Sequence, residues 1–210
     1  MKTVLLAAMA VLAFTGVATA DTRSIPVQAL HAIEVSGPFR IEITTGPTTS
    51  AVLEGATSEL AKLSAHVNGA RLVVRQRCGP VCIDGDDSIH VVLRVTAPVL
   101  QAIRVSKGAE ATAVGLNTRT LKLDVSTGGT LKADGVCDAL SAGARMGGEL
   151  DAGGLVCRDV DASASMGGAA HVNATQSVGA HASMGGSVKI SGSPLRHDAT
   201  AFMGGIVDGD

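Results

Sequence analysis

Four methionines are the side chains whose type and spacing first suggest chemistry in this sequence. Each one opens the same three-residue phrase, which is written as Met146-Gly147-Gly148, Met166-Gly167-Gly168, Met184-Gly185-Gly186 and Met203-Gly204-Gly205. Thioether sulfurs are soft ligands that suit Cu(I), so a column of methionines on neighbouring repeats could bind a soft metal ion. Methionine is also a flexible apolar side chain that fills gaps in a core. We interpret the four as buried core, and we predict no metal site and no cofactor.

Four cysteines offer a second kind of chemistry. Cys137 and Cys157 are 20 residues apart, which is one period of the repeat, so they should occupy the same place on adjacent coils. Neighbouring strands lie about 4.8 Å apart, within reach of a disulfide. We predict a Cys137–Cys157 disulfide. Cys78 and Cys82 either pair around Gly79-Pro80 or remain thiols, because their spacing is not that of a redox Cys-x-x-Cys motif.

Acidic and histidine side chains give weaker signals. The run Asp84-Gly85-Asp86-Asp87 is the one dense acidic cluster, but it lacks the order of an EF-hand and of calcium-binding β-rolls. We interpret it as a solvated loop. The histidines fall at different phases of the repeat, for example His171 five residues after its methionine and His181 three before the next. No Ser-His-Asp set stands out, and we predict no catalytic residues.

The repeat itself predicts the architecture that must position these side chains. Thr127-Gly128-Gly129 and Lys107-Gly108-Ala109 are fainter copies of the phrase, so its first residues are separated by 20, 19, 20, 18 and 19 positions. Self-similarity at about 20 residues is typical of a solenoid, whose units bury their apolar faces only by stacking on one another.

Alternation within each repeat indicates strands. The residues two, four and six positions before each phrase are apolar, namely Val125, Leu123, Leu121; Ala144, Ala142, Leu140; Ala164, Ala162, Val160; and Ala182, Ala180, Val178. Because residues two apart share a face, this parity places each methionine inward and Arg145, Ser165 and Ser183 outward. The two glycines would then form the corner. A second apolar pair follows each corner, as in Leu131 with Ala133 and Val188 with Ile190. Together these patterns predict a parallel β-solenoid.

Both ends of the repeat region, about residues 101–207, depart from the pattern. A lysine at an inward position is costly, so at Lys107 either the register slips or the stack begins only at Thr127. The last unit carries His197 and Phe202 at altered positions, as expected where a stack must be capped.

Residues of about 25–100 show short strands with ordinary turns instead of the repeat. Alternation and turn residues predict strands at 31–35, 39–43, 71–77 and 89–95, and a single helical turn at 58–63.

The N-terminus has the features of an export signal. Lys2 precedes an apolar run from Val4 to Phe14, and Ala18-Thr19-Ala20 provides a small-residue cleavage site. We predict a signal peptide over residues 1–20, cleaved after Ala20, and one domain over 21–210 that is periplasmic or extracellular. The run is too short for a membrane span, and no later stretch replaces it.

Composition lowers the expectation for several ligands. The formal net charge is −2, and the sequence has three Phe with no Tyr or Trp. Because the sequence lacks basic clusters and aromatic stacking platforms, we expect no nucleic-acid partner and little binding of sugars through aromatic stacking.

Three segments together with the repeats resemble the GIN-domain family of adhesin head domains. The segments are Ile33-Glu34-Val35-Ser36-Gly37-Pro38-Phe39-Arg40-Ile41-Glu42-Ile43, Val67-Asn68-Gly69-Ala70-Arg71-Leu72-Val73-Val74 and Ala97-Pro98-Val99-Leu100-Gln101-Ala102-Ile103. The resemblance covers about residues 30–207. It implies a single all-β domain that winds as a right-handed parallel β-helix in a bacterial envelope protein. The family has Ser-Gly corners where this chain has Met-Gly-Gly, which would change any shared corner surface.

These observations lead to one main functional hypothesis and one alternative. The main hypothesis is a noncatalytic exported envelope protein, a scaffold or adhesion-type binding module with an unknown envelope or surface partner and with homo-oligomers formed through the solenoid ends. The alternative is a polysaccharide-acting lyase or hydrolase, by analogy with other β-helices. Charged residues converging in one groove would favour the enzyme, whereas a face of Ser, Thr, Ala and Gly would favour the scaffold.

Overall fold

The structure is a computed structural model that describes residues 21–77 and 89–209. It is almost entirely β, with about five solenoid turns. The predicted signal peptide at residues 1–20 lies outside the described residues. So do Cys78, Cys82 and the acidic run at 84–87.

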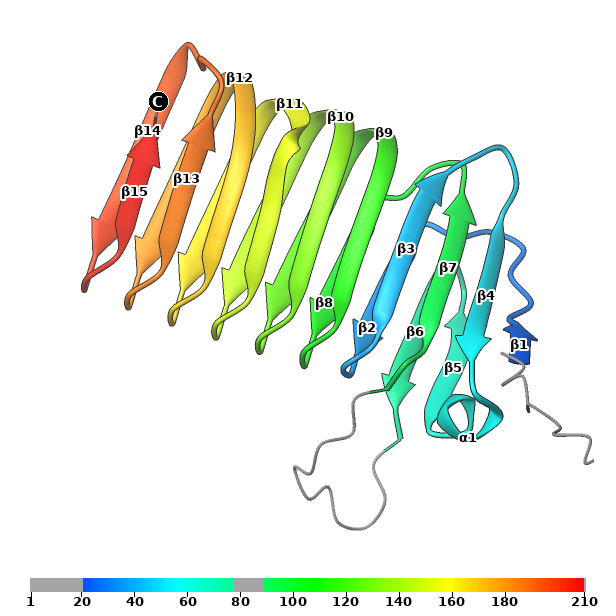
Figure 1. The fold of residues 1–210 in the computed structure, drawn as a ribbon. Coiled ribbons are helices and arrows are strands. Elements are labelled where there is room, and N and C mark those ends of the chain that lie inside the picture. The colour runs from blue at the N-terminus through cyan, green and yellow to red at the C-terminus, as the bar shows by residue number, and fades with distance from the viewer. Residues whose placement is uncertain (1–20, 78–88, 210) are drawn as a thin grey trace, which may run out of the picture.

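Fifteen strands and one short helix make up the described chain (Figure 1). In chain order they are β1 (Asp21–Ser24), β2 (Ala32–Ser36), β3 (Arg40–Thr45), β4 (Ser50–Gly55), α1 (Thr57–Leu60), β5 (Leu63–Asn68), β6 (Arg71–Gln76), β7 (Val92–Ala97), β8 (Ala102–Ser106), β9 (Glu110–Ser126), β10 (Thr130–Arg145), β11 (Glu149–Ser165), β12 (Ala169–Ser183), β13 (Ser187–Ser191), β14 (Arg196–Phe202) and β15 (Ile206–Gly209).

Each coil of the solenoid runs along two opposite sides of the molecule. The four long strands β9 to β12 bend midway, so each one contributes to both sides (Figure 1). We name the sides after their first coil. The β2 side contains β6, β2, β8, the second halves of the long strands and β14. The β3 side contains β7, β3, the first halves of the long strands, β13 and β15.

The core lies between these two sides and follows the predicted alternation. Leu121, Leu123 and Val125 before one corner are buried, and so are their counterparts on the next three coils. The apolar pairs after the corners are buried as well, including Leu131 with Ala133 and Val188 with Ile190. The parallel registers β9–β10, β10–β11 and β11–β12 stack these residues coil on coil. The predicted fold class is therefore confirmed.

The solenoid begins earlier than the repeated phrase suggests. Strands β2 and β3, joined through Ser36-Gly37-Pro38, pair in parallel with β8 and β9, so that Ala32 lies opposite Ala102 and Arg40 opposite Glu110. Lys107 is exposed at a corner of the same type as the later ones, with φ 56°. Its charge is in solvent. Neither the predicted register slip at Lys107 nor the predicted start of the stack at Thr127 is therefore needed.

Antiparallel strands close the N-terminal end. On the β3 side β4 pairs antiparallel with β7 and with β1, and on the β2 side β5 pairs antiparallel with β6. The predicted helical turn is shorter than expected, because Leu63 opens β5 instead of ending the helix. Strand β5 was not predicted, because its alternation of Leu63, Ala65 and Val67 is weak.

The C-terminal end is open, which contradicts the expectation of a cap in the last unit. All seven residues of β14 are exposed, including His197, and the Phe202 side chain is 55% exposed. Strands β14 and β15 are the outermost strands of their two sides, and no other described strand pairs with their outer edges. The altered residues of this unit therefore do not cover the end of the stack.

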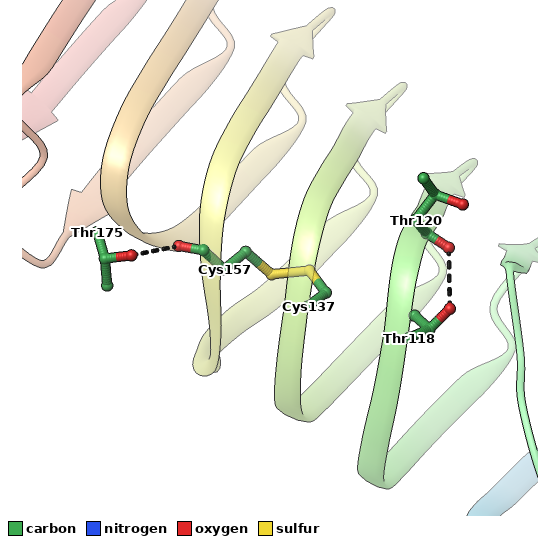
Figure 2. Close-up of a disulfide and its surroundings, with 5 residues drawn as sticks. All are labelled: Thr118, Thr120, Cys137, Cys157 and Thr175. Carbon is green, nitrogen blue, oxygen red and sulfur yellow. Dashed lines mark hydrogen bonds between the residues drawn. A yellow bond between two sulfur atoms is a disulfide. The ribbon is translucent and has the colours of Figure 1, made fainter.

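The predicted disulfide is present. Cys137 and Cys157 are Cα partners on β10 and β11, with Cα atoms 4.5 Å apart, and their sulfurs are bonded (Figure 2). Both residues are buried, at 7% and 1% exposure. Their counterparts on the flanking coils are Thr118 and Ala174. The cystine therefore joins two coils in the middle of the stack.

Candidate functional site

The repeated phrase forms a tight turn in which the methionine itself has a left-handed backbone. The φ angles of Met146, Met166, Met184 and Met203 are 50°, 51°, 49° and 51°, and those of the following glycines lie between 70° and 77°. The N–H of Gly148 donates a hydrogen bond to the carbonyl of Arg145 at 3.0 Å, and Gly168 bonds Ser165 in the same way. Positive φ at both central residues with this bond is the geometry of a type I′ turn.

The methionines therefore face solvent, and the prediction that they are core was wrong. Met146, Met166, Met184 and Met203 are 51%, 46%, 51% and 74% exposed. The strand ends at the residue before each methionine, and two positive φ angles follow. Two-residue alternation holds only along extended backbone, so parity carried through the turn gave the wrong side. The outward assignment of Arg145, Ser165 and Ser183 is correct.

The last glycine of each phrase has a separate role, because backbone atoms of the adjacent coil lie directly against it. A Cβ at Gly168 would lie 2.4 Å from the carbonyl oxygen of Ala144, and one at Gly186 would lie 2.4 Å from that of Ala164. Side-chain atoms at these positions would push adjacent coils apart. The missing side chain of this glycine therefore lets successive corners lie close together.

The corners stack into one continuous row, which we name the methionine edge (Met146, Met166, Met184 and Met203). The N–H of Gly147 donates to the carbonyl of Met166, and that of Gly167 to the carbonyl of Met184, both at 3.2 Å. Neighbouring methionines thus lie at equivalent positions on adjacent coils, with backbones about 4.8 Å apart. Thr127 and Lys107 hold the same position on the two preceding coils.

A second exposed feature lies on the β2 side, in its N-terminal half. We name it the basic patch, and it consists of Arg71, Arg75, Arg104, Lys122 and Arg145. Within it the carboxylate of Asp124 is 3.3 Å from Arg104, 3.8 Å from Lys122 and 3.6 Å from Arg145. Glu34 is ion-paired with Arg71 and Arg75. The five cations outnumber these two carboxylates, so the patch keeps a net positive charge.

The basic patch was not visible in the sequence, because its residues come from four different coils or strands. The parallel pairing of β6, β2, β8, β9 and β10 brings them together, for example with Glu34 opposite Arg104 and Arg104 opposite Asp124. Gly143 contributes room beside Asp124, since a Cβ there would lie 2.9 Å from the carboxylate oxygen Oδ1. Further along the same side the outward positions are mixed, with small residues such as Ser163 and Ser183 and the exposed carboxylates of Asp161 and Asp198.

A third feature is a chain of hydrogen bonds across the β3 side. His171 lies between Asp151 and Ser191, with Nδ1 3.2 Å from the Asp151 carboxylate and Nε2 2.8 Å from the Ser191 hydroxyl. The N–H of Gly153 donates to the same carboxylate oxygen at 3.2 Å. Gly153 also makes room for the imidazole, because a Cβ there would lie 2.4 Å from ring atom Cε1. An acid, an imidazole and a hydroxyl in this order have the connectivity of a catalytic triad.

No such set was expected from the sequence, but the structure brings these three side chains together. Asp151, His171 and Ser191 are each 20 residues apart, which is one repeat. This spacing alone does not reveal the contact, because the repeat that follows His171 is 18 residues long and not 20. Ser191 lies two positions beyond Lys189, the Cα partner of His171, so the contact is diagonal across the strands.

Among residues 21–77 and 89–209, no group of three or more His, Cys, Asp or Glu side chains is placed to hold a metal ion. Nor does any helix in these segments have the length and apolar character needed to cross a membrane.

The fold and its repeated corners agree with one protein family. Residues 29–194 match the family described as "Putative auto-transporter adhesin, head GIN domain". The chain belongs to this family. The resemblance noted from the sequence is thereby confirmed, whereas no protein of curated function matches the chain at a significant level.

Two bacterial proteins of known structure have a similar fold. An adhesin-like protein from Bacteroides fragilis superposes with a TM-score of 0.70 at 21% identity, covering 91% of this chain and 97% of that one. A protein from Parabacteroides distasonis described as "putative lipid binding protein" has a TM-score of 0.52 at 14% identity, over 93% and 98% of the two chains. At these identities the likeness concerns the fold alone.

Proposed function

We propose that this GIN-domain chain is a noncatalytic binding module of the bacterial cell envelope, exported and of adhesion type. The observation that carries the proposal is the outward face of the β2 side. Its charged half is the basic patch, in which Glu34 and Asp124 lie between cations and are not free to act as the acid and base of polysaccharide hydrolysis. Further along the same side, serines lie beside the exposed carboxylates of Asp161 and Asp198.

The basic patch gives the binding surface its ligand class, an anionic envelope polymer. Arg104, Lys122 and Arg145 have half-exposed side chains, at 51%, 57% and 52%. Guanidinium groups can bind carboxylate, sulfate or phosphate groups with two parallel hydrogen bonds. Stacked strands present these cations at regular intervals, which suits a polymer with regularly spaced charges.

A pair of triple variants tests this surface. The first, Arg104→Gln, Lys122→Gln and Arg145→Gln, removes three cations from the β2 side. The matched control, Arg40→Gln, Arg94→Gln and Lys132→Gln, removes three from the β3 side. Cosedimentation of the purified chain with isolated cell envelopes should fall in the first variant, remain in the second, and weaken with salt. Equal binding by both variants would contradict the proposal.

Export is tested separately. With residues 1–20 present the chain should be recovered from the periplasm or the medium, and it should begin at Asp21. Without them it should remain in the cytoplasm. Retention of the full-length chain in the cytoplasm would refute the proposed location.

We further propose that the open end joins a second copy of this chain. Antiparallel strands flank the N-terminal end, whereas no strand within the described residues pairs with the outer edges of β14 and β15, whose residues are exposed except for Val207. Such edges are templates for further strands, and a two-fold axis would pair β14 or β15 antiparallel with the partner. Light scattering should give a dimer mass, and Thr200→Pro in β14 should give a monomer. A wild-type monomer at all concentrations would oppose this proposal.

Hydrolysis is a second candidate function, favoured by the Ser191, His171 and Asp151 chain alone. In that role His171 would take the proton of Ser191 as the hydroxyl attacks a carbonyl carbon, and Asp151 would orient the imidazole. A fluorophosphonate probe should then label the wild type and not Ser191→Ala. If neither protein is labelled, the chain of bonds is a cross-strand contact that stabilises the sheet.

A further inference from the structure

We propose that the methionine edge binds soft monovalent cations, Cu(I) and Ag(I), through its thioether sulfurs. This inference is independent of the proposed function, since it concerns a different surface and different residues. It starts from the correction made above, because the burial that argued against a metal site does not exist. Four thioethers lie in one row at the surface, each about half exposed or more.

The fold does not explain why methionine occupies these positions. A left-handed backbone is unfavourable for residues with a Cβ by about 1–2 kcal/mol, and Gly, Asn or Asp normally occupy it. A half-exposed side chain recovers only part of the apolar stabilisation of a buried one. The residue before the methionine differs among the four coils, being Arg145, then serine twice, then Phe202, whereas the methionine recurs on all four. This pattern points to a use of the side chain.

The stacking brings the sulfurs within range of one another. Hydrogen bonds between corners keep Met146, Met166 and Met184 in register, so their side chains leave the edge in parallel, about 4.8 Å apart at the backbone. Methionine has three rotatable side-chain bonds. Sulfurs from two adjacent coils can therefore close on one ion without any change in the backbone, and each interior methionine has such a neighbour on both sides.

The chemistry of the donors determines which ions fit. Thioethers are neutral, soft ligands that favour Cu(I) over Zn²⁺, Mg²⁺ or Ca²⁺. They carry no proton that the metal ion must displace. Histidine and cysteine ligands do, so their metal affinity falls as the pH is lowered. Binding at this edge should therefore be nearly unchanged between about pH 5 and pH 8. His181, three residues before Met184 and exposed, is the nearby imidazole whose participation would give a pH dependence.

The test uses residues 21–210 with Cys78→Ser and Cys82→Ser, so that no thiol at these positions competes for the ion. Ag(I) is titrated calorimetrically, and Cu(I) is measured by competition with a chromophoric Cu(I) chelator. The comparison variant changes all four methionines to leucine, which keeps the apolar shape and removes only the sulfur. We expect affinity for both ions to fall at least tenfold in that variant, with unchanged circular dichroism. His181→Asn, the control, should bind as the parent does.

Single variants test the pairing of neighbouring coils. Met166→Leu disrupts two adjacent pairs, with Met146 and with Met184, whereas Met203→Leu disrupts one. The loss of bound Ag(I) should therefore be larger for Met166→Leu.

Three results would overturn the proposal. They are undiminished Ag(I) and Cu(I) binding in the all-leucine variant, absence of binding by the parent at micromolar ion, and equal losses for every single variant. Because envelope binding is tested with variants of the basic patch, failure of either proposal leaves the other standing.

Discussion

Each coil of this solenoid turns twice, and its two turning edges are built in opposite ways. At the methionine edge the coils from Lys107 onward use the same four-residue turn, with φ angles of the methionines that agree within 2°. At the other edge, which we name the bend edge, the long strands curve without a common turn. Their pairing registers shift there, between Ala133 and Gly135 in one pair and between Ala152 and Val156 in another.

Side chains stabilise the bend edge. Cys137 and Cys157 join two coils, and the hydroxyls of Thr175 and Thr118 donate to the carbonyls of Cys157 and Thr120 at 3.2 Å and 3.3 Å (Figure 2). At the methionine edge the backbone and the glycines determine the geometry. The methionine side chain is consequently not needed for the geometry of the turn, so a functional residue can recur at this position.

The largest expected effect concerns the bend edge. The double variant Cys137→Ala, Cys157→Ala removes the cross-link that closes a loop of 20 residues, and it should lower the free energy of unfolding by about 3 kcal/mol. Urea unfolding monitored by circular dichroism measures this change. Reduced wild type is the matched control. Unchanged stability in both proteins would show that the disulfide does not stabilise the bend edge.

Glycine substitutions distinguish the two roles within one corner of the methionine edge. Gly168→Ala places a Cβ against the Ala144 carbonyl and should lower stability by about 2–3 kcal/mol. Gly167→Ala meets no atom within 4 Å but must adopt φ of 72°, so it should lower stability by only about 1 kcal/mol. Thermal unfolding of the two variants in parallel checks the order, and a reversed order would refute the assigned roles.

A smaller effect of opposite sign is expected at the methionine itself. Met166→Gly relieves the left-handed backbone, although glycine makes the unfolded chain more flexible, so stability should rise by between zero and about 1 kcal/mol. Removal of a core methionine would instead lower stability by about 2–5 kcal/mol. Chemical denaturation of Met166→Gly and wild type separates these outcomes by their sign.

The features of the fold that follow from periodicity could be predicted from the sequence alone. The 20-residue period placed Cys137 beside Cys157, and alternation identified Leu121, Leu123 and Val125 as core. It failed at the turn, because a change of backbone region at Met146 breaks alternation and leaves no mark in the apolar pattern. It also failed at β5, where the apolar residues are few.

The candidate surfaces were harder to predict than the fold. Arg71, Arg104 and Lys122 become neighbours only through pairing of strands from different parts of the chain. The contact of His171 with Ser191 depends on a two-residue diagonal offset that spacing does not reveal. Such contacts are set by register and side-chain direction, which a single sequence specifies weakly.

The central claim, that the methionine edge faces solvent, can be measured directly. From residue 21 onward the chain has four methionines, all of them on this edge. In a protein labelled with ¹³C at the methionine methyl groups, a soluble gadolinium chelate should broaden all four signals strongly, and that of Met203, which is 74% exposed, the most. Four signals that stay sharp at chelate concentrations that broaden surface methyl groups would contradict the account.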